Sequence, residues 1–240
     1  MVELFIGLAT GILGALLGLG GGFILVPFLS MAGYPIHTAV GTSSASIVFT
    51  ALSASVAYWR HGTVRFKEGT LLASTSVIGA YIGAWLTDFI SSRELKVAFG
   101  AAMVYAGTRM FIKRNFRTGS APTFWVPIGG FGAGILSGLL GIGGGIINVP
   151  LLHATGLSIH ESVATSSFSI IFTASSGALK HAILGNVDFH ALLFLVPGLV
   201  VGAQIGAWLA RKMESKRLKI VFSLVVIALA LRMIAGGLAE

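Results

Sequence analysis

The sequence predicts an all-helical integral membrane protein built from two inverted repeats, and three observations lead to this fold class. Charged residues make up only 10% of the 240 residues and hydrophobic residues 55%, whereas about 25% of residues are charged in soluble domains. The first half of the chain matches the second half without a gap. A cluster of glycines interrupts one apolar segment in each half, at "GLGGG" (18–22) and "GIGGG" (141–145).

Six apolar runs are long enough to cross a bilayer as helices, which requires roughly 17–25 residues. Strands of a membrane barrel would be shorter and would alternate polar with apolar residues, and these runs do neither. The lipid bilayer is therefore an expected partner. The runs lie at about 39–59, 70–90, 95–112, 162–183, 190–210 and 218–238.

A shift of 123 residues aligns the chain with itself, and about 45 of 104 positions in 7–110 are identical to their partners in 130–233. Such self-similarity indicates a repeated structural unit. We expect repeat 1 over 1–112 and repeat 2 over 125–240, joined by a basic linker, 113–124. The two repeats are expected to form one membrane domain, because each alone would leave a large apolar face without a partner.

The positions of the basic residues indicate that the two repeats have opposite orientations, because Lys and Arg collect in cytoplasmic loops. An even number of crossings per half would put nine and seven basic residues on the two sides, and an odd number gives twelve and four. The odd, inverted arrangement is therefore expected, with loop 60–67, the linker and loop 211–219 in the cytoplasm and both termini outside. These loops also explain the net charge of +8 without a nucleic-acid partner.

Each glycine cluster is expected to form the tip of a helical hairpin near the middle of the membrane, beside three transmembrane helices in each repeat. The arm after the first cluster, residues 23–32, is about 15 Å long as a helix, half of the roughly 30 Å hydrocarbon core. Irregular backbone at that depth is tolerated only where protein packs around it or where it lines a cavity. The sequence leaves open whether these short hairpins cross fully or re-enter from one side.

A helix that begins directly after a glycine cluster points its free N–H groups and its positive dipole end at the tip, which suits an anion. The alternative is that glycine only permits close packing, which we expect for the spaced pairs Gly7/Gly11, Gly79/Gly83 and Gly202/Gly206. In the second repeat, Asn148 replaces Leu25. The candidate anion-binding residues at the tips are Gly20, Gly21, Gly22, Phe23, Gly143, Gly144, Gly145, Ile146 and Asn148.

A stripe of hydroxyl side chains follows each cluster, in "TSSAS" (42–46) and "TSSFS" (165–169). The stripe lies roughly 10 Å along its helix, close to the depth of the tips, and hydroxyl donors there suit an oxyanion. Hydrogen bonding within or between helices is an equal alternative. The candidates are Thr42, Ser43, Ser46, Thr165, Ser166 and Ser169. His37 and His160 are candidates for a gate or proton relay, and the alternative is that they are helix caps or interfacial residues.

No carboxylate lies in the middle of an apolar run, because all eight acidic residues are at span ends, in loops or at the termini. This pattern disfavours cation transport and carboxylate proton relays, and it leaves no acid–base pair for hydrolysis. The absence of cysteine excludes thiolate catalysis and cysteine-bound metals. We therefore expect a small anion as substrate, and no catalytic residue, metal or cofactor.

At these residues the chain resembles the TauE/SafE sulfite exporter family, also called the toluene-sulfonate uptake permease group. The resemblance covers the whole chain and rests on "LLGLGGGFILVPFL" (16–29) and "LLGIGGGIINVPLL" (139–152), each followed by a "TSS" helix. It implies transport of sulfite or of organosulfonates such as sulfoacetate. Thiosulfate transporters that depend on cysteine form a different group, and the lack of cysteine argues against that chemistry.

The sequence thus predicts a multi-pass transporter of the cell membrane that exports a small sulfur oxyanion bound between the two tips. An inside-negative potential contributes about 2.3 kcal/mol per charge per 100 mV toward anion exit. The alternatives are an anion channel, a sulfonate uptake permease and a membrane scaffold subunit that transports nothing. The sequence does not fix the particular anion, the coupling ion or whether the protein forms a homo-oligomer.

Overall fold

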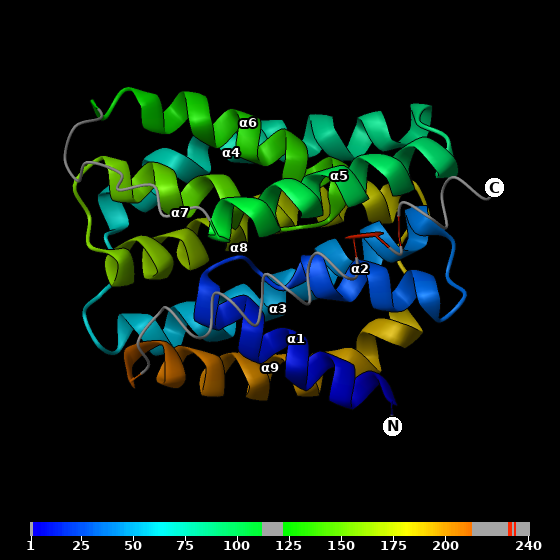
Figure 1. Ribbon diagram of the computed structural model, residues 1–240, viewed down its shortest axis with the longest axis horizontal. Coiled ribbons are helices and arrows are strands. Elements are labelled where there is room, and N and C mark those ends of the chain that lie inside the picture. Colours follow the sequence, from blue (N-terminus) through cyan, green and yellow to red (C-terminus); the bar gives the residue numbers. More distant parts are fainter. Residues whose placement is uncertain (1, 112–121, 213–229, 232, 234–240) are drawn as a thin grey trace.

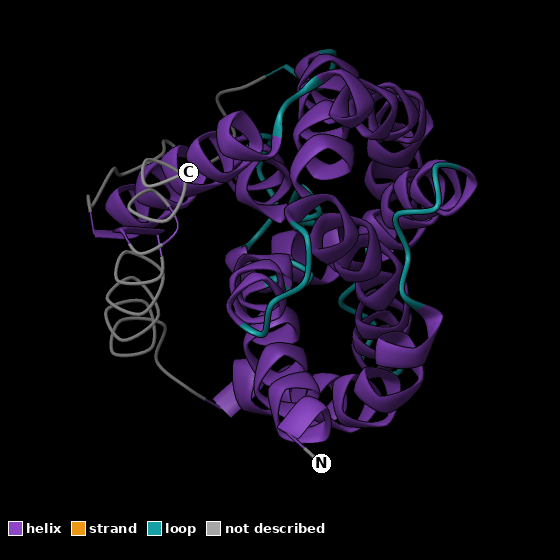
Figure 2. Cartoon of the chain, turned by 90° about the vertical axis from the view of Figure 1, so that its right-hand side faces the viewer, coloured by secondary structure: helices purple, strands orange, loops and turns teal. Residues whose placement is uncertain are grey.

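The computed structural model describes residues 2–111, 122–212, 230, 231 and 233, and these form helices and loops without a strand (Figure 1; Figure 2). Residues 113–121 of the linker 113–124 and most of the expected span 218–238 lie outside the described residues. The helices are α1 (Val2–Leu17), α2 (Gly22–Met31), α3 (Ile36–Trp59), α4 (Phe66–Leu86), the 3₁₀ helix η1 (Thr87–Phe89), α5 (Ser92–Phe111), α6 (Trp125–Leu140), α7 (Gly145–Ala154), α8 (Ile159–Ile183) and α9 (Phe189–Lys212).

Over the described residues, the helices of the second half, α6 to α9, follow in the same order as α1 to α4 and have similar lengths. Helices α1 and α6 each have 16 residues, and α2 and α7 each have 10. Among the described helices, three are long and apolar enough to span a bilayer: α3, the segment Phe66–Phe89 and α9. Helices α5 and α8 form at the expected runs 95–112 and 162–183. The chain is therefore an all-helical membrane protein.

The two halves interlock by exchanging helices. Helix α1 packs along α9 on one side of the molecule and α6 packs along α4 on the other, with α3 and α8 side by side between them (Figure 1). Glycines make these contacts close: a Cβ at Gly11 would lie 2.4 Å from the Leu199 carbonyl oxygen, and one at Gly79 would lie 2.3 Å from that of Phe131. The packing role expected for the spaced glycine pairs is confirmed.

The two central helices, α3 and α8, run in opposite directions. Near the start of α3, Thr42 Oγ1 accepts a hydrogen bond of 2.9 Å from the N–H of Asp188, which follows the end of α8. Near the start of α8, Thr165 Oγ1 accepts one of 3.0 Å from the N–H of Arg65, which follows the end of α3. These two helices, which match in the sequence repeat, are thus antiparallel in space.

The described acidic residues stay away from the middle of the long helices, as expected. Four lie in the first turns of helices, one lies in η1 and one lies in the loop before α9. They are Glu3, Glu68, Glu94, Glu161, Asp88 and Asp188.

Candidate functional site

The two glycine turns, 18–21 between α1 and α2 and 141–144 between α6 and α7, meet inside the protein. A Cβ at Gly22 would lie 1.9 Å from the carbonyl oxygen of Gly141, and a Cβ at Gly145 would lie 2.1 Å from that of Gly18. Both turns are fully buried. The halves therefore touch backbone to backbone here, which is possible only because no side chain stands between them.

Glycine is also required for the backbone conformation at the start of each short helix. Gly21 and Gly144 are the N-cap residues of α2 and α7, with φ of +94° and +74°, in the left-handed region that side chains avoid. Neither offers a side chain to cap the helix. The first N–H groups of an α-helix have no partner within it, so each turn presents buried donors at the positive end of a helix.

The middle serine of each "TSS" segment holds the turn of the opposite half. Ser43 Oγ donates to the Gly141 carbonyl at 2.8 Å, and Ser166 Oγ donates to the Gly18 carbonyl at 3.0 Å. The preceding threonines, Thr42 and Thr165, accept the loop N–H groups described above. These four candidates therefore make hydrogen bonds within the protein, which was the alternative to substrate contact.

Ser46 and Ser169, the last residues of "TSSAS" and "TSSFS", differ in their surroundings. Ser46 is fully buried, and its Oγ has no hydrogen-bond partner among the described residues. Its counterpart Ser169 donates to the Ser166 carbonyl at 3.1 Å and accepts from Nδ2 of Asn148 at 3.5 Å. Ser46 is thus a hydroxyl with both its donor and its acceptor capacity unused.

Two further buried polar atoms near the turns also lack partners. One is Oδ1 of Asn148 on α7, and the other is Oγ1 of Thr10 on α1. Thr10 lies against Gly21, since a Cβ on that glycine would come within 2.7 Å of the threonine methyl group. The sequence analysis missed Thr10. It could have been found as a hydroxyl in the apolar run "GLATGILG", at the position where the second half has Ala133.

The remaining candidates are two apolar residues, Phe23 and Ile146, and two histidines, His37 and His160. Phe23 is buried against Phe99, with ring centroids 6.3 Å apart, and Ile146 packs at the edge of the same core. His37 Nε2 lies 3.0 Å from the Ile90 carbonyl oxygen and 3.2 Å from that of Thr87, so its side chain joins α3 to the end of η1. His160 is exposed at the start of α8. The structure does not bring either histidine to the turns.

A matched pair of residues braces the helix before each turn, and sequence reasoning missed it as well. Tyr58 donates its hydroxyl to the Ala15 carbonyl at 2.8 Å, and His181 Nε2 lies 2.8 Å from the Gly138 carbonyl oxygen. The two positions are equivalent in the repeat. The equivalence is hard to see in the sequence because one residue is a tyrosine and the other a histidine.

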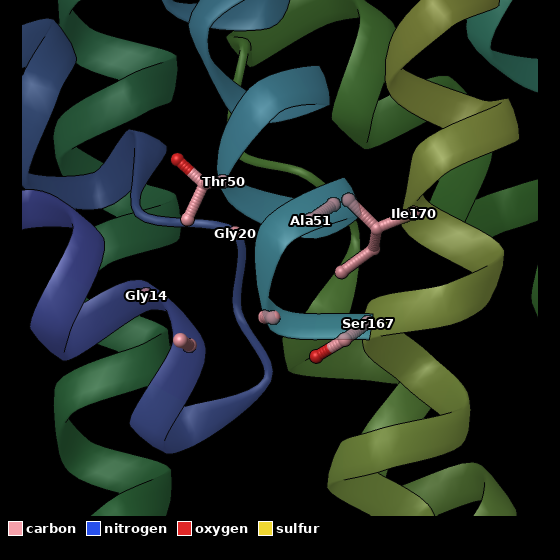
Figure 3. A pocket seen from close by; sticks show the side chains of 8 residues that line it. Gly14, Gly20, Thr50, Ala51, Ser167 and Ile170 are labelled. Carbon is pink, nitrogen blue, oxygen red and sulfur yellow. The ribbon is translucent and has the colours of Figure 1, made fainter. Parts of the chain in front are cut away.

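Beside Gly20, a small hollow opens between α1, α3 and α8 (Figure 3). It is nowhere wide enough for a water molecule. The turns are therefore tightly enclosed in this conformation. The residues that line the hollow are Gly14, Ala15, Gly20, Thr50, Ala51, Ala54, Ser167 and Ile170.

Long apolar helices around paired half-length helices are typical of helical membrane transporters. The model of the family described as sulfite exporter TauE/SafE matches residues 3–233, and the chain belongs to this family. No solved structure matches it.

Several relatives are named as probable membrane transporter proteins. The probable membrane transporter protein YunE of Bacillus subtilis (strain 168) is 32% identical, over 99% of this chain and 98% of the relative. YdhB of the same strain is 34% identical, over 91% and 92%. The probable membrane transporter protein MJ0441 of Methanocaldococcus jannaschii is 28% identical, over 96% and 94%.

Proposed function

We propose that this protein is a secondary transporter that carries a small sulfur oxyanion, sulfite or an organosulfonate, out of the cell. The observation that carries the proposal is the meeting of two buried turns, each followed at once by the start of a helix. Both helix starts carry positive partial charge and unpaired N–H groups. Two positive helix ends buried close together favour an anion between them, and the family's description supplies the sulfur oxyanion.

The same proposal includes an inverted topology in the cell membrane, with the linker 113–124 in the cytoplasm. The antiparallel packing of α3 and α8 supports it, because these helices match in the repeat. The division of twelve against four basic residues supports it from the sequence. The 10-residue lengths of α2 and α7 support glycine-tipped hairpins that reach the middle of the membrane, since each helix is about 15 Å long.

The contacts at the turns suggest how the site opens. The hydrogen bonds from Ser43 and Ser166 to opposite turns each contribute only about 1 kcal/mol net. The α1–α9 and α4–α6 contacts are interlocked along their length by glycines. We propose that these two helix pairs move as units about α3 and α8, breaking the serine hydrogen bonds on one side at a time.

Flux in proteoliposomes tests the function. Vesicles loaded with sulfite should release it faster with the protein than without it, and an inside-negative potential should increase the rate. Release that saturates with sulfite concentration indicates a transporter, whereas release without saturation indicates a channel. No movement of sulfite or a sulfonate in either direction would contradict the proposal and leave the scaffold role.

Cysteine labelling tests the topology, because the natural chain has no cysteine. His61 and His190 are both exposed and lie in regions expected on opposite sides of the membrane. In intact cells a membrane-impermeant maleimide should label His190→Cys, and it should label His61→Cys only after permeabilisation. Labelling of both from outside would refute the inverted arrangement.

A further inference from the structure

The two halves differ in one buried residue beside the turns. Asn148 on α7 occupies the position that Leu25 has on α2, and both side chains are 0% exposed. A buried polar side chain costs free energy unless its hydrogen bonds are made. The half that carries leucine folds around the same position without a polar group, so packing alone does not require the amide.

The hydrogen bonds around Asn148 fix which way its amide points. Ser169 gives its only hydroxyl proton to the Ser166 carbonyl. Ser169 Oγ can therefore only accept from Asn148, and its partner at 3.5 Å must be the Nδ2–H of the amide. Oδ1 then lies on the other side of the amide and has no donor among the described residues.

The unpaired oxygen belongs to an amide side chain near the start of α7. Asn148 is the fourth residue after the N-cap Gly144, and side chains on a helix lean toward its N-terminus. Consistent with this, Nδ2 lies 3.5 Å from the position that a Cβ would take on Gly144. The site on this half therefore combines backbone N–H donors with one side-chain oxygen that can only accept.

An anion that fits this combination has two different ends. Its charged oxygens satisfy the N–H groups, but another bare oxygen beside Oδ1 would put two acceptors together. We infer that Oδ1 of Asn148 accepts a hydrogen bond from an O–H or N–H group of the transported anion. The inference rests on the proposed function. It names the substrate class as a monoanion that carries a donor, such as hydrogensulfite or a hydroxyl- or amino-substituted sulfonate.

The first half does not repeat this acceptor. Leu25 offers no polar atom, and the hydroxyl of Thr10, where the second half has Ala133, rotates to donate or to accept. Among the described residues at the turns, an oxygen that can only accept is therefore present in the second half and not in the first. This difference favours one orientation of the anion between two otherwise similar turns.

Competition against sulfite flux tests the inference with two sulfonates that differ only in a hydroxyl group. The probes are 2-hydroxyethanesulfonate and ethanesulfonate, which have the same charge and carbon skeleton. In the wild-type protein we expect the hydroxylated anion to inhibit the flux of labelled sulfite at about tenfold lower concentration, the effect of one hydrogen bond to a buried acceptor. In Asn148→Leu, which copies Leu25 of the first half, the ratio should fall to about one.

Two further variants separate selectivity from folding. Ser169→Ala removes the partner that orients the amide and should also lower the ratio. Thr10→Val should weaken sulfite flux but leave the ratio unchanged. The thermal unfolding midpoint of Asn148→Leu should equal or exceed that of the wild type, because a buried unpaired oxygen is removed.

Each outcome decides the inference. Three outcomes overturn it: equal inhibition by both probes in the wild type, inhibition by neither probe, or an unchanged ratio in Asn148→Leu. In each of these cases sulfite flux continues, and the proposed function stands. Absence of wild-type sulfite flux overturns the proposed function, and the inference falls with it.

Discussion

The contact between the glycine turns can be tested by adding one methyl group to Gly22. The Cβ of alanine would lie 1.9 Å from the Gly141 carbonyl oxygen, whereas ordinary contact begins at 3.4 Å, so the turns would have to separate by about 1.5 Å. Overpacking costs about 1–3 kcal/mol when side chains can adjust. Here both sides are backbone, so we expect about 3 kcal/mol for Gly22→Ala and a similar value for Gly145→Ala.

The measurement is the thermal unfolding midpoint in detergent. For a chain of this size, 1 kcal/mol shifts the midpoint by about 2–4 °C, so each variant should unfold about 6–12 °C lower than the wild type. The matched control is Gly132→Ala in α6, where a Cβ meets nothing within 4 Å. That variant should be as stable as the wild type or about 1 kcal/mol more stable. Equal midpoints for Gly22→Ala and Gly132→Ala would refute the contact between the turns.

Three further predictions concern hydrogen bonds that hold the turns and their helices. Ser43→Ala leaves the Gly141 carbonyl without its donor and should lower stability by about 1–3 kcal/mol; an unchanged unfolding midpoint would argue against the bond. Tyr58→Phe removes the bond to the Ala15 carbonyl and should cost about 1 kcal/mol in the same assay, whereas no loss would show that the hydroxyl is not needed. Ser158→Ala removes the capping box of α8 and should cost about 1 kcal/mol, measured by chemical denaturation, where no shift in the midpoint would contradict the cap.

The repeat, the long helices and the interruption at the glycines follow from the sequence because each leaves a local signature. An apolar run must have the length of the membrane, and consecutive glycines are costly in a helix interior. The packing role of the spaced pair Gly79 and Gly83 also follows from the sequence, since residues four apart share one helix face.

The exchange of helices between halves could not be predicted from the sequence. Gly11 presents the same small surface whether it packs on its own repeat or on the other, and the structure places it against Leu199. The partner of Ser43 was equally undetermined, because a hydroxyl on a membrane helix bonds to its own helix, to another or to a ligand. Which of these occurs depends on distances that only the packed halves define.

The central claim is that the anion binds at the two turns, and the unpaired hydroxyls of Thr10 and Ser46 allow the most direct test. Neither hydroxyl bonds to the described protein, so Thr10→Val combined with Ser46→Ala removes ligand contacts at little cost to stability. The measurement is sulfite efflux from proteoliposomes with an inside-negative potential, with Ser175→Ala, an exposed serine on α8, as control. We expect efflux at low sulfite concentration to fall about tenfold or more, since a hydrogen bond to a charged group contributes about 1.5–3 kcal/mol. Efflux of the double variant equal to that of Ser175→Ala would contradict binding at the turns.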